Sequence, residues 1–158
     1  MPTAASTPPI DLPDEDATRA LATRLAPRLR QGDLVALRGD LGAGKTAFAR
    51  ALIRALTDPE EEVPSPTFTL VQTYDAPSGT IWHFDLYRLA GPEEVLELGW
   101  DEAAGGIALV EWPERLGRML PPDRLELELA VTGPGSRRAV LAGGPSWAGR
   151  LAGLEGRS

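Results

Sequence analysis

Residues 39–46 read Gly39-Asp40-Leu41-Gly42-Ala43-Gly44-Lys45-Thr46, which matches the phosphate-binding pattern G-x-x-x-x-G-K-[ST] at every fixed position. In such a loop, backbone N–H groups surround a β-phosphate, and glycine keeps bulky side chains out of their way. The helix that follows adds its positive dipole end. Lys45 can reach the β- and γ-phosphates, and the Thr46 hydroxyl can bind Mg²⁺. The stretch therefore predicts a site for a nucleoside triphosphate.

The segments on both sides have the context that such a loop needs, a strand before it and a helix after it. Asp33-Leu34-Val35-Ala36-Leu37-Arg38 is a short apolar run of the kind that a buried parallel strand shows. After Thr46, apolar residues recur at helical spacing, namely Phe48, Ala51, Leu52, Ala55 and Leu56. Lys45 is also the only lysine among 16 lysine and arginine residues. These features favour a nucleotide-binding loop over a glycine-rich turn that matches by chance.

Composition narrows the class of protein. The 158 residues suffice for one ordinary domain, and a formal net charge of −7 disfavours direct binding to nucleic acid or to an anionic membrane. The absence of cysteine excludes disulfides and thiolate chemistry. No apolar run approaches the roughly 18 residues of a membrane span, and no signal peptide is evident, so we expect a cytoplasmic protein. Because asparagine is absent, so is the guanine-reading N-K-x-D motif, which favours ATP over GTP.

The chain divides into a leader, one domain and a tail. Residues 1–11 predict a loose leader, residues 12–142 the nucleotide-binding domain, and residues 143–158 a tail with a short helix from Pro145. A helix is expected from Asp14 onward, because acidic residues fill its first turn and leucines then repeat every four residues.

Other elements follow from local patterns. Pro27 should kink the first helix or end it near Ala26. The remaining expected elements are strands at 67–74 and 80–87 that form a hairpin, a short helix at 91–99, a strand at 106–111, and a second hairpin from 124–132 and 137–141.

A carboxylate at the end of a buried strand beside the loop should help to hold magnesium. Glu111 ends Ile107-Ala108-Leu109-Val110, which is apolar throughout, as in a central strand. Asp85 ends Ile81-Trp82-His83-Phe84, whose mixed composition suits a more peripheral strand. We therefore assign Glu111, with Thr46, to the metal, and Asp85 to the attacking water or to metal-bound water. The alternative for each carboxylate is a solvated group at a strand end.

Three more polar residues are open to two interpretations each. Thr67, with Ser65, offers a hydroxyl from a proline-stiffened segment and either senses a γ-phosphate or stabilises a turn. His83, the only histidine, shares a strand face with Asp85 and is either a catalytic base or a hydrogen-bonded packing residue. Arg88 either faces the transition-state charge or pairs with a surface carboxylate.

Four segments together, in this order, resemble the bacterial TsaE (YjeE) family, ATPases of tRNA threonylcarbamoyladenosine biosynthesis. They are the loop quoted above, Ser65-Pro66-Thr67-Phe68-Thr69-Leu70-Val71, His83-Phe84-Asp85-Leu86-Tyr87-Arg88-Leu89, and Glu111-Trp112-Pro113-Glu114. The similarity extends from about Leu12 to Leu141, and the combination is much more specific than the loop alone.

The resemblance implies an α/β fold, a P-loop NTPase-like three-layer domain with a mixed central sheet. It implies weak ATPase activity in isolation, ATP and Mg²⁺ as ligands, TsaB and TsaD as partner subunits, and tRNA contact only through their complex. In this family Thr46 and Glu111 would hold Mg²⁺ and residues 65–68 would act as a switch. Glu15 and Thr18 would lie near the nucleotide base. Lys45, Thr67 and Asp85 complete our predicted catalytic set.

Three functions from different classes fit these observations. The first is an ATPase subunit that resets a tRNA-modifying complex. The second is a small-molecule phosphotransferase, although no insertion is long enough for an obvious lid over a phosphoryl acceptor. The third is a nucleotide-binding interaction module without essential turnover.

Overall fold

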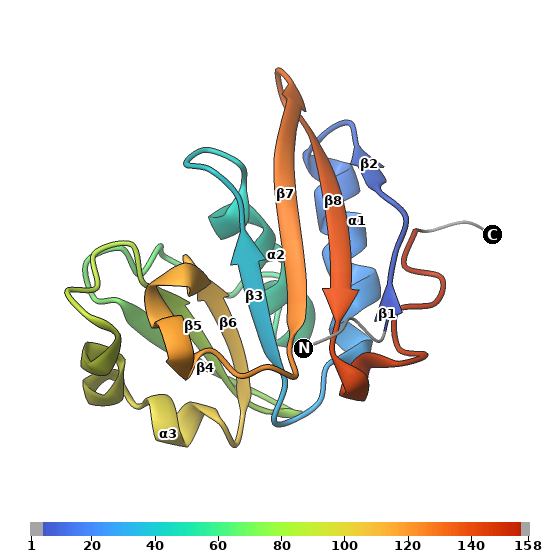
Figure 1. Ribbon diagram of the computed structural model, residues 1–158. Coiled ribbons are helices and arrows are strands. Elements are labelled where there is room, and N and C mark those ends of the chain that lie inside the picture. Colours follow the sequence, from blue (N-terminus) through green and yellow to red (C-terminus); the bar gives the residue numbers. More distant parts are fainter. Residues whose placement is uncertain (1–4, 156–158) are drawn as a thin grey trace.

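One mixed β-sheet organises the molecule (Figure 1). The computed structural model describes residues 5–155. The strands are β1 (Ala5–Ser6), β2 (Ile10–Leu12), β3 (Leu34–Arg38), β4 (Val71–Ala76), β5 (Gly79–Asp85), β6 (Ile107–Glu111), β7 (Leu125–Gly133) and β8 (Ser136–Gly143). Within the described residues their order is β1-β8-β7-β3-β6-β5-β4, and β2 also pairs with β8. The four central strands, β7-β3-β6-β5, are parallel, and the outer pairings are antiparallel.

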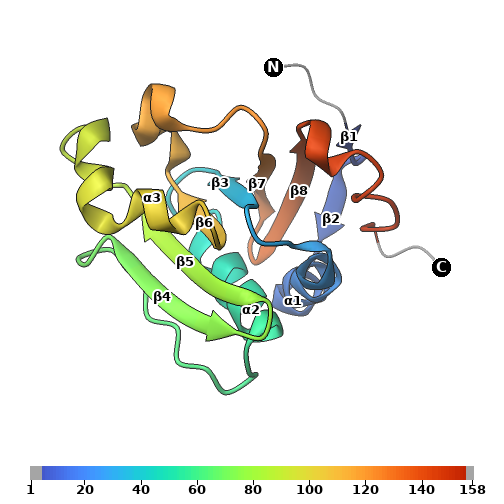
Figure 2. The ribbon, with the colours of Figure 1, turned by 90° about the horizontal axis from the view of Figure 1, so that it is seen from below.

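Helices cover both faces of the sheet, which gives the predicted three-layer α/β arrangement (Figure 2). One face carries α1 (Glu15–Leu25) and α2 (Lys45–Leu56), and the other carries the short helices η2 (Pro92–Leu98), α3 (Trp100–Ala103) and η3 (Pro113–Met119). Every residue of β6 is buried, and alternate residues of this strand join the two opposite cores. The apolar runs at β3 and β6 are thus covered on both faces, as predicted for central parallel strands.

The first helix forms where its sequence signals lie. Asp14 caps α1, because its carboxylate accepts a hydrogen bond of 2.9 Å from the Ala17 N–H, and Glu15 begins the helix. The α-helix ends at Leu25 and continues as the 3₁₀ helix η1 (Ala26–Arg28), which contains Pro27. The expected effect of this proline is confirmed, since proline cannot donate the backbone hydrogen bond that an α-helix would require.

The β4–β5 hairpin starts later than predicted. We expected its first strand from Thr67, but β4 begins at Val71 and residues 67–70 form a turn. Leu70 adopts a left-handed conformation with φ 70°, and its N–H donates to the Pro66 carbonyl at 2.7 Å. This turn overrides the strand propensity of the segment and brings Thr67 back toward the end of β5. The second expected hairpin is present as β7 and β8.

The described part of the predicted leader is more ordered than expected. We predicted a loose leader over residues 1–11, yet Ala5–Ser6 and Ile10–Leu12 pair with β8, and Ile10 and Leu12 are buried. The alternation Ile10-Asp11-Leu12 explains the pairing, because it directs two apolar side chains into the core and one carboxylate outward. Residues 1–4 of that predicted leader lie outside the described residues.

The tail also packs against the core. Its helical part is limited to η4 (Pro145–Trp147), and turns follow. Trp147, Leu151 and Leu154 are buried in the core that α1 and α2 cover. Residues 156–158 of the predicted tail lie outside the described part of the chain. Between residues 5 and 155, no helix has both the length and the apolar character needed to cross a membrane.

Candidate functional site

The glycine-rich loop (Gly39–Thr46) connects the end of β3 to the start of α2. A Cβ at Gly39 would lie only 2.7 Å from the Leu129 carbonyl oxygen, and Gly39 has a φ of 149°. Gly44 precedes α2 in a left-handed conformation with φ 98°. Glycine is therefore required at the first position by close backbone packing and at Gly44 by the turn into the helix.

Lys45 lies almost fully buried at the mouth of this loop. Its Nζ donates hydrogen bonds to the carbonyl oxygens of Gly39 and Asp40, the latter at 3.1 Å, and lies 3.9 Å from the centre of the Trp112 ring. Burial lowers the pKa of Lys45, while nearby carboxylates oppose that shift, namely Glu111, Glu114, Asp85 and Asp40. Because burial destabilises the ammonium charge, an anion bound beside Lys45 would compensate for the lost solvation.

Thr46, Glu111 and His83 form one hydrogen-bonded row. The Thr46 hydroxyl donates to Oε1 of Glu111 at 2.7 Å, and Nε2 of His83 lies 2.7 Å from Oε2 of the same carboxylate. Glu111 is 2% exposed and His83 is fully buried. With Glu111 ionised, His83 must carry its proton on Nε2 in order to donate to the carboxylate. His83 is thus buried and hydrogen-bonded, which fits the second of the two interpretations that its sequence left open.

Asp85 and Thr67 meet beside this row. Oδ2 of Asp85 accepts a hydrogen bond of 3.2 Å from the Thr67 hydroxyl, which in turn lies 2.7 Å from the Ser65 hydroxyl. In the β5–β6 register, Asp85 pairs directly with Glu111. Since parallel strands end at the same edge of a sheet, the two predicted carboxylates come together there. Arg88, by contrast, lies over the exposed Phe68 ring, with its guanidinium carbon 4.8 Å from the ring centre.

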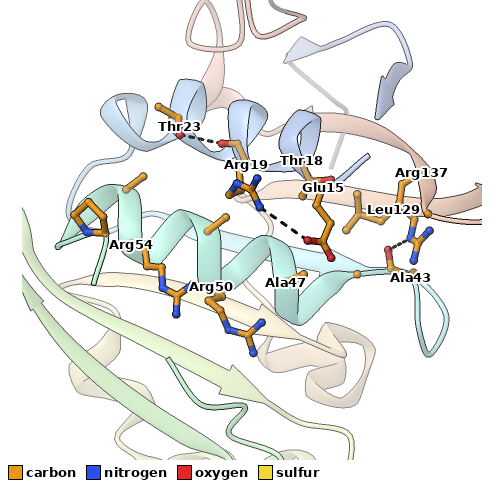
Figure 3. Close-up of a pocket in the computed structure, with 15 residues that line it drawn as sticks. Glu15, Thr18, Arg19, Thr23, Ala43, Ala47, Arg50, Arg54, Leu129 and Arg137 are labelled. Atoms are coloured by element: carbon orange, nitrogen blue, oxygen red, sulfur yellow. Dashed lines mark hydrogen bonds and ion pairs between the residues drawn. The ribbon is translucent and has the colours of Figure 1, made fainter. Parts of the chain in front are cut away.

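A cavity of about 480 Å³ opens between α1 and α2 and reaches the glycine-rich loop (Figure 3). Glu15 and Thr18 line it from α1, and Ala43, Gly44 and Ala47 line it at the loop and at the start of α2. The structure therefore places the two residues predicted near a nucleotide base on a cavity that adjoins the predicted phosphate site. Leu41, at the tip of the loop, is 69% exposed.

Comparison with known proteins assigns this chain to a protein family. The family model described as "Threonylcarbamoyl adenosine biosynthesis protein TsaE" matches residues 12–139. The chain belongs to the TsaE family. This result confirms the resemblance that the four sequence segments indicated, and the matched range contains the loop, the Thr67 turn and both carboxylates. The family match ends before the packed tail.

Individual members of the TsaE family support the same assignment. A relative from Rickettsia felis is 46% identical over 121 residues, which cover 76% of this chain and 71% of the relative. One from Bacillus subtilis is 36% identical over 128 residues, covering 80% and 79% of the two chains. Both are named tRNA threonylcarbamoyladenosine biosynthesis protein TsaE.

A solved structure supports the fold. The crystal structure of YdiB from Bacillus subtilis matches 98% of this chain and 97% of its own, with a TM-score of 0.77 and 26% identity. The architecture is therefore a P-loop-type α/β fold with a mixed sheet, as predicted.

The oxygen atoms of Thr46 and Glu111 suit a hard divalent cation in this TsaE-family site, because Mg²⁺ prefers oxygen ligands and usually binds through one or two protein groups plus phosphates. Among residues 5–155, no group of three or more histidine, aspartate or glutamate side chains could hold a metal ion. A cation at Thr46 and Glu111 would thus need further ligands from a phosphate chain or from water.

One contact to the glycine-rich loop was missed by the sequence analysis. Arg137, on β8, donates from Nε to the Ala43 carbonyl at 2.9 Å and from Nη2 to the Gly42 carbonyl at 3.1 Å. Its neighbour Arg138 instead pairs with Asp11 at 3.1 Å on the exposed side of the hairpin. Alternation along the strand could show that the two arginines face opposite sides, but not which of them reaches the loop.

Proposed function

We propose that this chain is the ATP-hydrolysing subunit of the system that makes N6-threonylcarbamoyladenosine in tRNA, and that it drives or resets a TsaB–TsaD complex. Family membership supports the place in tRNA modification. The hydrogen bond between Thr46 and Glu111 carries the enzymatic part of the proposal. It connects the last residue of the glycine-rich loop to the buried end of a central strand, which is where a P-loop enzyme needs a hydroxyl and a carboxylate together.

ATP binding would use groups that are already oriented. The glycine-rich loop and the start of α2 offer backbone N–H groups to the phosphates, and Lys45 would exchange its carbonyl partners for phosphate oxygens. The adenosine part would enter the cavity lined by Glu15 and Thr18. Thr46 and Glu111 would hold Mg²⁺. When held there, Mg²⁺ would supply positive charge that stabilises the negative charge developing on the phosphates.

Hydrolysis requires a water molecule aligned with the γ-phosphate and an acceptor for its proton. Asp85 is 5% exposed and lies at the same sheet edge as Glu111, which supports a role in which its carboxylate would orient that water. Thr67 donates to Asp85 across a turn rather than a strand, so this segment can change partners when a γ-phosphate is present. The products are ADP and inorganic phosphate. Asp85 would accept the proton that the attacking water loses.

The net charge of −7 supports indirect rather than direct action on tRNA, because a surface that binds nucleic acid tightly is usually basic. We therefore assign tRNA contact to the TsaB–TsaD complex. ATP turnover in this chain would supply the free energy for a change in that complex.

The direct test measures ADP and phosphate release by the purified chain, alone and with TsaB, TsaD and tRNA. We expect slow, Mg²⁺-dependent release that the complex accelerates and that Lys45→Ala abolishes. If ATP is consumed only with stoichiometric phosphorylation of a small acceptor, the chain is a phosphotransferase. If Asp85→Ala binds ATP and loses turnover but the complex still works normally, the chain is an interaction module.

A further inference from the structure

The β7–β8 hairpin touches the glycine-rich loop at two separate places. On β7, the Leu129 carbonyl oxygen lies so near Gly39 that a Cβ at this glycine would approach it to 2.7 Å. On β8, Arg137 binds the carbonyl oxygens of Gly42 and Ala43. The hairpin thus packs along the loop. Among the described residues, Arg137 is the only side chain of the hairpin that hydrogen-bonds to the loop.

The two Arg137 contacts fix the orientation of peptide groups. In a planar trans peptide, the C=O bond and the following N–H bond point in opposite directions. An arginine that holds the Ala43 carbonyl on one side therefore directs the Gly44 N–H toward the other side, away from the guanidinium. The backbone N–H groups of such a loop are the donors that bind phosphate. Orienting them before the ligand arrives removes part of the ordering cost of binding.

Arg137 itself is held firmly. Its Nη1 donates to the Ser136 carbonyl at 2.9 Å, so all three guanidinium nitrogens are bonded to backbone carbonyls. In the β2–β8 pairing, Leu12 lies opposite Arg137, which ties this part of the hairpin to the buried edge strand. A lysine could not reproduce these contacts, because its ammonium is a single point rather than a planar fork of donors.

We infer that Arg137 is a positioning residue that presets the glycine-rich loop for a phosphate-bearing ligand. The inference rests on the proposed function in one respect, that the ligand is a nucleotide. It adds a role for the hairpin, which holds the loop in its binding shape and also lines the adjoining cavity through Leu129, Gly135 and Arg137. Arg137 acts through Gly42 and Ala43 and is not assigned to the chemical step.

The experiment compares Arg137→Ala, Arg137→Lys and the matched control Arg138→Ala in the full-length chain. Arg138 is the exposed neighbour with the same charge, so its removal reproduces the charge change without the loop contacts. Nucleotide binding is measured as the dissociation constants of ADP and of ATP with Mg²⁺, and steady-state hydrolysis gives kcat and KM separately. Hydrogen exchange of the backbone amides of residues 42–44 is measured without nucleotide. Urea unfolding of each variant checks that the fold persists.

We expect Arg137→Ala and Arg137→Lys to raise the dissociation constants of both ADP and ATP by about tenfold or more. We also expect faster exchange at the 42–44 amides and a raised KM with a nearly unchanged kcat. Arg138→Ala should stay within about twofold of the wild type.

Several results would overturn the inference. Wild-type affinity in Arg137→Lys would show that charge alone is sufficient. An equal loss in Arg138→Ala would indicate a general charge effect, and a large fall in kcat would place Arg137 at the reaction itself. If the wild-type chain bound no nucleotide, the proposed function would fail, whereas unchanged amide exchange in Arg137→Ala would refute the positioning role by itself.

Discussion

The Thr46 hydroxyl donates a hydrogen bond to Oε1 of Glu111 at 2.7 Å, although 65 residues separate them in the chain. This contact connects the start of α2 to the end of β6. A bound metal–nucleotide complex would have to contact both of these elements. His83 holds the opposite oxygen of the same carboxylate at 2.7 Å. The carboxylate is thus oriented from both sides.

Glu111→Gln should remove most of the effect of Mg²⁺ on ATP affinity. The amide keeps the shape of the side chain but loses the negative charge that a divalent cation needs. We expect the ratio of the ATP dissociation constants without and with Mg²⁺ to fall by about tenfold or more. Calorimetric titration measures that ratio, with the exposed Glu128→Gln as the control. An unaltered ratio in Glu111→Gln would refute the assignment of Glu111 to the metal.

Asp85→Asn should reduce kcat by about 100-fold while leaving the ATP dissociation constant nearly unchanged. An amide cannot accept a proton from water, yet it retains the size of the carboxylate and can still contact Thr67. Phosphate release under saturating ATP measures this loss. Asp75→Asn is the matched control, because Asp75 is exposed on the neighbouring strand of the same hairpin. A normal kcat in Asp85→Asn would exclude Asp85 from the chemical step.

Glu126 should contribute to the pH dependence of stability. Burial by itself would raise the pKa of Glu126, but hydrogen bonds from Arg38 and Arg124 outweigh it and lower the pKa below the usual 4.5. Because the folded-state pKa is the lower one, the stabilisation is present above pH 4.5 and is lost as pH falls through the folded-state value.

The corresponding variant is Glu126→Gln. It should lower the free energy of unfolding by about 1 kcal/mol near neutral pH, and by progressively less as the pH falls. Urea unfolding at several pH values gives the difference between the two free-energy curves. A difference that grows as the pH falls would contradict the sign of the shift.

Trp147→Ala should lower the free energy of unfolding by about 3–5 kcal/mol. Trp147 is 1% exposed and packs so closely on Gly143 that a Cβ there would lie 2.3 Å from its own Cβ. Urea denaturation compares this variant with Val131→Ala, an exposed apolar residue expected to cost less than about 0.5 kcal/mol. If Trp147→Ala were as stable as the control, the tail would not be part of the core.

Much of the site could be predicted because its signals are local. The apolar runs before Gly39 and Glu111 indicate central parallel strands, and the carboxyl ends of parallel strands meet at one edge. That rule placed Glu111 and Asp85 together with the glycine-rich loop. The loop pattern itself specified the turn, the lysine and the hydroxyl of Thr46.

The features that were missed depend on tertiary contacts. Ala5–Ser6 is too short to show a strand period, and it forms a strand only because β8 offers an edge. The segment from Thr67 has strand-forming residues, yet the left-handed Leu70 turns it. The role of Arg137 depends on the register of β8 beside the loop, which no local pattern encodes.

The central claim is that ATP hydrolysis by this chain renews a tRNA-modifying complex, and repeated turnover in a reconstituted system tests it most directly. TsaB, TsaD, tRNA and the remaining substrates are combined with either the wild-type chain or Asp85→Ala, and modified tRNA is counted per complex. We predict many rounds with the wild type and a halt near one round with the variant, at equal nucleotide occupancy. Equal multiple-turnover yields from both chains would contradict the account.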